Sequence, residues 1–190
     1  MRSAVRIGLF YLKPRQVAFI RAVGPYAASS QQAWNDMFAW MTRNKLDTKT
    51  GFGYGLALDH ADPVGVENRR YDACIDLPSD FTPNKNDGLA LQTLPGGAFA
   101  RFRHVGPYEG VGSVIGKVRD AWLASQDTLV VDRRRPLLVV YLDNRLLQTR
   151  DKQRCDVCIP VRTHHEDVYA RTQFSDMHAH ETTAGFRVGM

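Results

Sequence analysis

The 190-residue chain predicts an α+β fold made of two related halves, each running strand, strand, helix, strand, strand. The tripeptide Gly-Pro-Tyr occurs at residues 24–26 and again at residues 106–108. The segments around each copy also resemble one another and follow in the same order. Alternating apolar segments flank two segments with helical periodicity, as expected for strands and helices. Repetition at a near-constant spacing is typical of a duplicated unit.

The repeat extends well beyond the tripeptide. The matched segments are 17–21 with 99–103, Trp40 with Trp122, and 71–75 with 155–159. The offset drifts only from 82 to 84 residues. We therefore expect two halves, about 5–78 and 89–161, related by a pseudo-twofold axis within one domain that spans residues 1–161.

The local patterns predict the following elements. We expect strands over 5–12, 17–22, 52–58, 71–77, 89–93, 98–104, 137–142 and 155–161, and helices from a Ser29 or Ser30 cap to Asn44 and over 111–125. Turn-forming residues at 79–88 predict the linker between the halves. Because a helix joins two strand pairs in each half, we expect an antiparallel-rich sheet with helices on one face and a ligand groove on the other.

Residues 162–190 have no counterpart in the first half, and we expect a mobile or loosely packed tail. They carry four of the six histidines, at positions 164, 165, 178 and 180. Without cysteines or an ordered spacing, these histidines do not predict a closed metal site.

Composition excludes several classes of protein. No apolar run approaches the roughly 18 residues of a membrane span, and the N-terminus lacks the long apolar region of a signal peptide. Three cysteines are an odd number, which favours reduced core thiols and a cytoplasmic location, with a disulfide as the alternative. The net charge of +5 comes from scattered arginine clusters without interleaved aromatics, so we do not expect direct nucleic-acid binding.

Strand alternation suggests where a ligand would bind. When the two halves are aligned through Asp59 and Asp143, one face carries small residues in the first half and larger ones in the second. These six candidate ligand-binding residues are Gly53, Gly55, Ala57, Leu137, Val139 and Tyr141. The opposite face is large and apolar throughout, including Tyr54, and we assign it to the helices.

Asp72 and Asp156 occupy matched positions and are expected on the face away from the helices. They are candidates to hold a cationic or amphipathic ligand among aromatic rings. The alternative is that both are exposed strand residues facing Arg70 or Arg154. We expect the three tryptophans and Tyr108 to belong to the core.

The motifs taken together resemble a known family. Residues 21–26, 70–75, 94–97, 102–110, 141–144 and 156–161 resemble the GyrI-like small-molecule-binding domain, the effector-binding module of many AraC-type regulators. The resemblance covers residues 5–161. It implies two pseudo-symmetric halves with a ligand groove between them, and a role in transcription regulation or multidrug binding. Because the chain starts almost at its first strand, we expect a stand-alone member.

The resemblance leaves three functions open. The first is binding of an amphipathic or hydrophobic small molecule, without a cofactor. The second is interaction with a regulator or a topoisomerase, as in gyrase-inhibiting members. The third is hydrolysis of small reactive compounds. Members usually carry a glutamate two residues before the tyrosine that corresponds to Tyr141, and here that residue is Val139. Valine has no ionisable group, so we assign no catalytic residue.

Overall fold

The computed structural model describes residues 6–46, 53–60, 63–83, 88–144 and 148–163. Within these residues the chain forms nine strands and two α-helices, and every strand pairing is antiparallel. The predicted α+β class is confirmed. No helix in the described part is both long enough and apolar enough to cross a membrane.

The elements follow in the predicted order. In the first half they are β1 (Ile7–Leu12), β2 (Arg15–Val23), α1 (Tyr26–Arg43), β3 (Gly53–Ala57) and β4 (Arg70–Ile75). In the second half they are β5 (Ala90–Leu94), β6 (Gly97–Val105), α2 (Val111–Leu123), β7 (Leu129–Val131), β8 (Leu137–Tyr141) and β9 (Arg154–Thr163). Short 3₁₀ turns occupy Val66–Asn68, Tyr108–Gly110 and Arg150–Lys152.

The largest differences from the prediction concern α1, β7 and β9. Helix α1 begins at Tyr26 and not near Ser29, because the Pro25 carbonyl already accepts the amide protons of Ala28 and Ser29. Strand β7 was not expected, since three residues are too few to show alternation. Strand β9 runs to Thr163, beyond the predicted domain end at 161. The predicted tail begins at residue 162, and its residues 164–190, which hold the four histidines, lie outside the described residues.

The Gly-Pro-Tyr motif is the turn between a strand and the segment that leads into a helix. Gly24 and Gly106 have φ angles of 137° and 136°, which side chains rarely tolerate. The following proline cannot continue the ladder because it has no amide proton. The motif therefore ends β2 and β6 at equivalent points and directs the chain toward α1 and α2.

The strand order is β1-β6-β9-β8-β3-β4-β2-β5, and β7 pairs with β9. The counterparts of β1, β2, β3 and β4 in the second half are β5, β6, β8 and β9. If every strand is replaced by its counterpart, the resulting order is the original order read from the other end. Strands β3 and β8 meet at the centre, and each lead-in strand pairs with the other half. Such an order is expected of two related halves, although the duplication itself stays a prediction.

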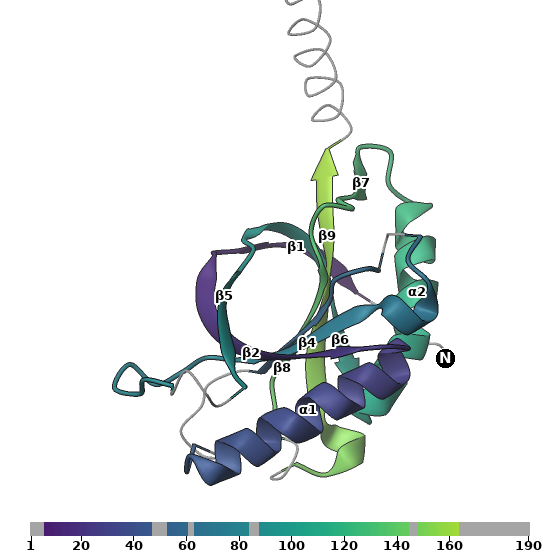
Figure 1. Cartoon of the computed structure of the whole chain (residues 1–190). Coiled ribbons are helices and arrows are strands. Elements are labelled where there is room, and N and C mark those ends of the chain that lie inside the picture. The colour runs from purple at the N-terminus through teal and green to yellow at the C-terminus, as the bar shows by residue number, and fades with distance from the viewer. Residues whose placement is uncertain (1–5, 47–52, 61–62, 84–87, 145–147, 164–190) are drawn as a thin grey trace, which may run out of the picture.

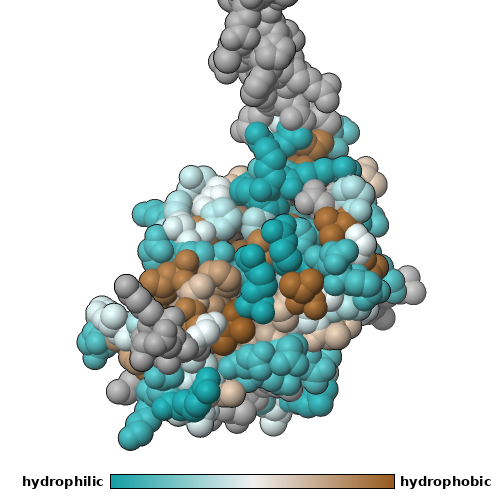
Figure 2. Space-filling model, in the orientation of Figure 1, coloured by the Kyte–Doolittle hydropathy of each residue, from teal (hydrophilic) through white to brown (hydrophobic). Residues whose placement is uncertain are grey.

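The sheet curls strongly (Figure 1). Buried hydrophobic side chains form a separate core on each of its faces. On one face, α1 covers β2 and β4, and α2 covers β8 and β9. On the other face, residues of the curled strands enclose a second core that contains Val17, Tyr54, Leu94, Phe99 and Leu138. Figure 2 shows that side chains, many of them hydrophobic, fill the opening that the ribbon of β1, β2 and β5 seems to leave.

This double core overturns the predicted assignment of the two sheet faces. The helices cover the face with Gly53 and Gly55, and a Cβ at Gly53 would lie 2.7 Å from the Trp34 ring of α1. The large apolar face with Tyr54 and Leu138 is buried in the curl of the sheet instead. The prediction assumed that the larger residues must meet the helices, but both faces are buried.

Candidate functional site

A cavity of about 760 Å³ lies between α1, α2 and the centre of the sheet. Helix α1 contributes one wall and α2 the opposite wall, while β3, β4 and β8 form the floor. Such a volume is within the usual range for small-molecule sites in proteins. The groove predicted on the helix-free face is therefore misplaced, since this cavity is on the face that the helices cover.

Aromatic rings make up much of the cavity wall. They are Tyr26, Trp34, Phe38, Tyr71, Tyr108 and Tyr141. The Tyr141 ring lies 5.0 Å from the Trp34 ring and 4.8 Å from the Tyr108 ring, centroid to centroid, and both contacts are edge-to-face. Edge-to-face packing holds rings in defined orientations, so the wall offers preformed faces on which a flat apolar ligand can stack.

The tyrosine hydroxyls at the centre satisfy one another. The Tyr71 and Tyr141 hydroxyl oxygens are 3.0 Å apart, and the Trp34 indole donates to the Tyr71 hydroxyl over 3.2 Å. Burial raises the pKa of Tyr71 to about 12 and that of Tyr141 well above its ordinary value. Both hydroxyls are therefore neutral at physiological pH, and the floor of the cavity is polar but uncharged.

Glycines at the floor make room for these rings. A Cβ at Gly55 would overlap the Tyr71 hydroxyl and lie 3.3 Å from the Tyr141 ring. Gly55 pairs across the sheet with Val139, and Gly53 pairs with Tyr141. Small residues on β3 thus let side chains from β4, β8 and α1 converge over the centre of the sheet.

The Gly-Pro-Tyr tyrosines connect each helix start to a strand end. The Tyr26 hydroxyl accepts the Asp59 amide proton over 2.9 Å, while the Tyr108 hydroxyl lies 3.0 Å from the carbonyl oxygens of Asp143 and Arg154. Burial raises the pKa of Tyr108 to about 12, so this donor keeps its proton. The repeated tyrosine therefore has a structural role and also forms part of the cavity wall.

Charged side chains also line the cavity. Asp143 is held by Arg154, whose side-chain hydrogen bonds lower the pKa of Asp143, and Glu109 pairs with Arg150. Arg119 donates to Asp120. Asp143, Glu109, Arg119 and Arg69 line the cavity, whereas Val139, on the floor, brings no charge.

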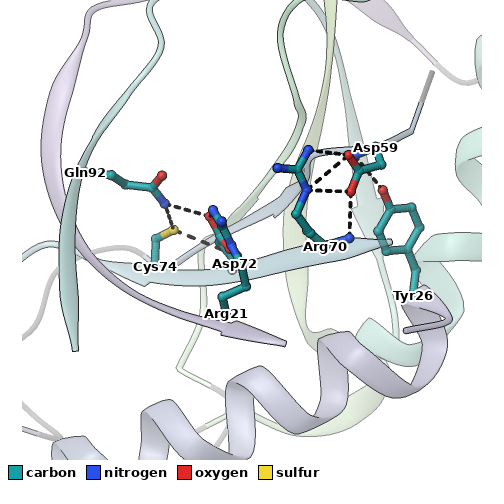
Figure 3. A network of polar contacts seen from close by, with 7 residues as sticks. All are labelled: Arg21, Tyr26, Asp59, Arg70, Asp72, Cys74 and Gln92. Carbon is teal, nitrogen blue, oxygen red and sulfur yellow. Dashed lines mark hydrogen bonds and ion pairs between the residues drawn. The ribbon is translucent and has the colours of Figure 1, made fainter. Parts of the chain in front are cut away.

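Asp72 and Asp156 lie away from this cavity. The sheet register places Asp72 beside Leu56, on the face opposite Gly55. Asp72 is fully buried and forms a two-pronged ion pair with Arg21, at 2.7 and 2.9 Å, and Gln92 donates to it as well. Figure 3 shows Asp72 and Gln92 on the side of β4 turned away from α1.

The expected alternative for these aspartates was also wrong in its details. Both are buried rather than exposed, and Asp156 is bound by Arg103. The arginines named in the alternative pair elsewhere: Arg70 binds Asp59 and Arg154 binds Asp143 (Figure 3 for Arg70 and Asp59). The matched carboxylates are therefore satisfied within the sheet.

The structure thus brings six of the eight candidate residues together around one cavity. These six are Gly53, Gly55, Ala57, Leu137, Val139 and Tyr141. Trp34 and Tyr108, expected in the core, also line it. The apolar stripe of α1 gave no sign of this role, because a cavity wall and a core contact have the same helical spacing. No group of three or more potential metal ligands occurs in the described ranges.

Comparison with known proteins identifies the family. The model of the GyrI-like small molecule binding domain matches residues 9–162. The "DNA gyrase inhibitor" of Cronobacter turicensis is 28% identical over 156 residues, which cover 78% of this chain and 92% of that protein.

Solved structures show the same fold. The EcmrR C-terminal domain superposes with a TM-score of 0.62 at 16% identity, covering 84% of this chain and 99% of that one. The structure of SAV2435 bound to tetraphenylphosphonium has a TM-score of 0.53 at 14% identity, covering 83% and 94%. The chain belongs to the GyrI-like small molecule binding domain family.

Proposed function

We propose that the chain binds a small molecule with an aromatic or otherwise apolar body in the cavity between α1 and α2. The aromatic wall, in which Trp34 and Tyr108 each pack against Tyr141, is the observation that carries the proposal. Its rings are preformed, so a ligand that stacks on them does not have to order the wall first. The binding unit is the domain predicted over 1–161.

The proposed role is that of an effector-binding module in transcription regulation, in the cytoplasm. The fold shared with the EcmrR C-terminal domain supports the regulatory part. The cysteines Cys74, Cys155 and Cys158 are free and buried, which fits a reducing compartment.

A blocked cavity tests the binding site. Gly116 lines the cavity, and a Cβ there would meet nothing within 4 Å, so Gly116→Phe places a ring in the open space. Lys117, the next residue of α2, is exposed and outside the cavity wall, which makes Lys117→Phe the matched control. The probe is N-phenyl-1-naphthylamine, a neutral aromatic whose fluorescence rises in apolar sites.

We expect the wild type and Lys117→Phe to bind this probe equally, and Gly116→Phe to lose at least tenfold in affinity. If all three proteins show a native thermal transition and bind the probe equally, the probe binds elsewhere. That result would overturn the proposed site. Failure of the wild type to bind would overturn the ligand class.

A second candidate function is inhibition of DNA gyrase. It is favoured by the likeness to the Cronobacter turicensis protein, which extends over 92% of that protein's length. A supercoiling assay with purified gyrase and micromolar protein tests it. Inhibition that titrates with protein supports this function, and unchanged supercoiling removes it. A hydrolase is not favoured, because both carboxylates described in the cavity wall, Glu109 and Asp143, are held by arginines.

A further inference from the structure

The cavity wall contains a cation for which the structure describes no acid. Arg69 lines the cavity immediately before β4, and none of the carboxylates in the described ranges lies within ion-pair distance of it. Its Nε is buried and has no hydrogen-bond acceptor there either. The other charged groups of the wall, Arg119, Glu109 and Asp143, each have a described partner.

One contact positions the guanidinium and another positions the backbone of Arg69. The central carbon of the guanidinium lies 5.6 Å from the centre of the Tyr26 ring, in a cation–π contact. The backbone carbonyl of Arg69 accepts the Gly24 amide proton over 2.8 Å, which ties the residue to the Gly-Pro-Tyr turn. A planar guanidinium held in this way presents its remaining donors in a fork that matches a carboxylate, sulfonate or phosphate.

The second half of the chain provides an internal comparison. The residue 84 positions after Arg69 is Gln153, whose carbonyl accepts the Gly106 amide proton over 2.8 Å, as Arg69 does for Gly24. Gln153 is buried and does not line the cavity. The turn therefore works with a neutral amide at this place, so the scaffold does not require the charge of Arg69.

The chemistry of the wall completes the argument. The centre of the cavity is neutral, with Val139 on the floor and uncharged tyrosine hydroxyls beside it. A fixed guanidinium without an acid attracts an anion and repels a cation, and it does so more strongly in an apolar cavity than in water. We infer that the cavity selects amphipathic ligands that carry an anionic group, with the aromatic body against Trp34 and Tyr141 and the anion on Arg69.

The inference rests on the proposed function, and a pair of probes separates the two. N-phenyl-1-naphthylamine is neutral, and 8-anilino-1-naphthalenesulfonate has the same two ring systems plus a sulfonate. The quantity to measure is the ratio of the two dissociation constants, by fluorescence titration at low ionic strength. The proteins are the wild type, Arg69→Gln, Arg69→Lys and Arg119→Gln, each checked for its thermal transition.

We expect Arg69→Gln to weaken sulfonate binding about tenfold relative to the neutral probe, which corresponds to about 1.4 kcal/mol. Neutral-probe affinity should stay within about twofold. Arg69→Lys keeps the charge and should retain most of the preference. Arg119→Gln removes a cavity-wall arginine that already has a partner, and it should leave the ratio unchanged.

The outcomes distinguish the two claims. If the neutral probe binds but Arg69→Gln leaves the ratio at the wild-type value, the anion inference is wrong and the apolar site stands. If Arg119→Gln changes the ratio as much as Arg69→Gln, the preference comes from general positive charge, and Arg69 is not the anchor. If the wild type does not bind the neutral probe, the proposed function fails first.

Discussion

The hydroxyl oxygens of Tyr71 and Tyr141 lie 3.0 Å apart and connect β4, from the first half of the chain, to β8, from the second half. Gly55 of β3 lies beneath both rings, and the Trp34 indole donates to the Tyr71 hydroxyl. This small network positions the aromatic wall of the cavity, so changes to it test how the cavity is built.

Removing the two hydroxyls should have unequal effects. Tyr141→Phe loses one hydrogen bond and should lower the free energy of unfolding by about 1 kcal/mol. Tyr71→Phe should cost about 2 kcal/mol, since the Trp34 donor is also left without its acceptor. Urea denaturation of both single variants and the double variant measures this. If the two single effects simply added in the double variant, the hydroxyls would not interact.

Adding a methyl group at Gly55 should disturb the wall directly. The new Cβ would overlap the Tyr71 hydroxyl, so Gly55→Ala should displace both tyrosines, destabilise the fold by roughly 1–3 kcal/mol and weaken neutral-probe binding. The matched control is Gly112→Ala in α2, where a Cβ meets nothing within 4 Å. Alanine favours a helix over glycine, so the control should be neutral or slightly stabilising. Equal effects would contradict the close packing at Gly55.

A carboxylate at position 139 should change the charge preference of the cavity. Val139 is buried on the floor, next to Gly55 across the sheet. Val139→Glu should increase affinity for tetraphenylphosphonium at least tenfold over Val139→Gln, while lowering stability because a carboxyl group becomes buried. Isothermal titration measures the affinities. Equal affinities of the two variants would show that position 139 does not face the bound cation.

Stability should fall in acid as Asp59 and Asp143 become protonated. Side-chain hydrogen bonds from Arg70 and Arg154, respectively, lower the pKa of each carboxyl group in the folded chain. A carboxyl group whose pKa is lower when folded stabilises the fold above its unfolded pKa, about 4. That contribution is lost as pH falls from about 4 through the folded pKa.

The matched variants for this pH dependence are Asp59→Asn and Asp120→Asn. Asp59 is buried, so Asp59→Asn should lower the free energy of unfolding by about 1–2 kcal/mol at pH 7. The stability of this variant should also fall less steeply than that of the wild type as the pH is lowered. Asp120 is mostly exposed, and its pairing with Arg119 should contribute little. Denaturant unfolding between pH 2 and 7 tests this. An identical loss of stability with falling pH in Asp59→Asn and the wild type would contradict it.

The cysteines should be unreactive in the folded protein. Burial raises the pKa of Cys155 and Cys158 to about 12, and that of Cys74 also upward. Since the thiolate is the reactive form, a disulfide reagent such as DTNB at pH 8 should label none of the three quickly. All three should react in denaturant. Rapid labelling of a cysteine in the native protein would mean that the core around it opens readily. Cys155 belongs to the core beneath α2, and Cys74 and Cys158 belong to the core inside the curl of the sheet.

Much of the fold was predictable because its signals are local. The repeated Gly-Pro-Tyr motif reflects a positive φ at Gly24 and Gly106, and only a few residues satisfy that geometry. Alternation located the strands. The exchange of β1 and β5 between the halves was not predictable, because nothing local distinguishes pairing with one's own half from pairing with the other.

Six of the cavity-lining residues were predictable from the sequence, but the face of the sheet on which the cavity lies was not. Alternation grouped Gly55 with Val139 and Tyr141 correctly, since these strands pair in register. It could not say which face meets the helices, because the curled sheet buries both faces. Asp72 does face away from the helices, as alternation predicted, but it lies beside Leu56 and therefore not on the face that carries the cavity. Trp34 was missed because a cavity-lining ring and a core ring have the same sequence pattern.

The most direct test of ligand binding in the cavity is to follow the indole N–H resonances of the tryptophans by NMR during titration with N-phenyl-1-naphthylamine. Trp34 lines the cavity, Trp40 is buried in the core beneath α1, and Trp122 packs under α2 outside the cavity wall. We expect the Trp34 resonance, assigned with Trp34→Phe, to move most and in proportion to occupancy. If the Trp34 resonance does not shift when the protein is saturated with the probe, and the Trp40 or Trp122 resonance shifts instead, the ligand does not bind in this cavity.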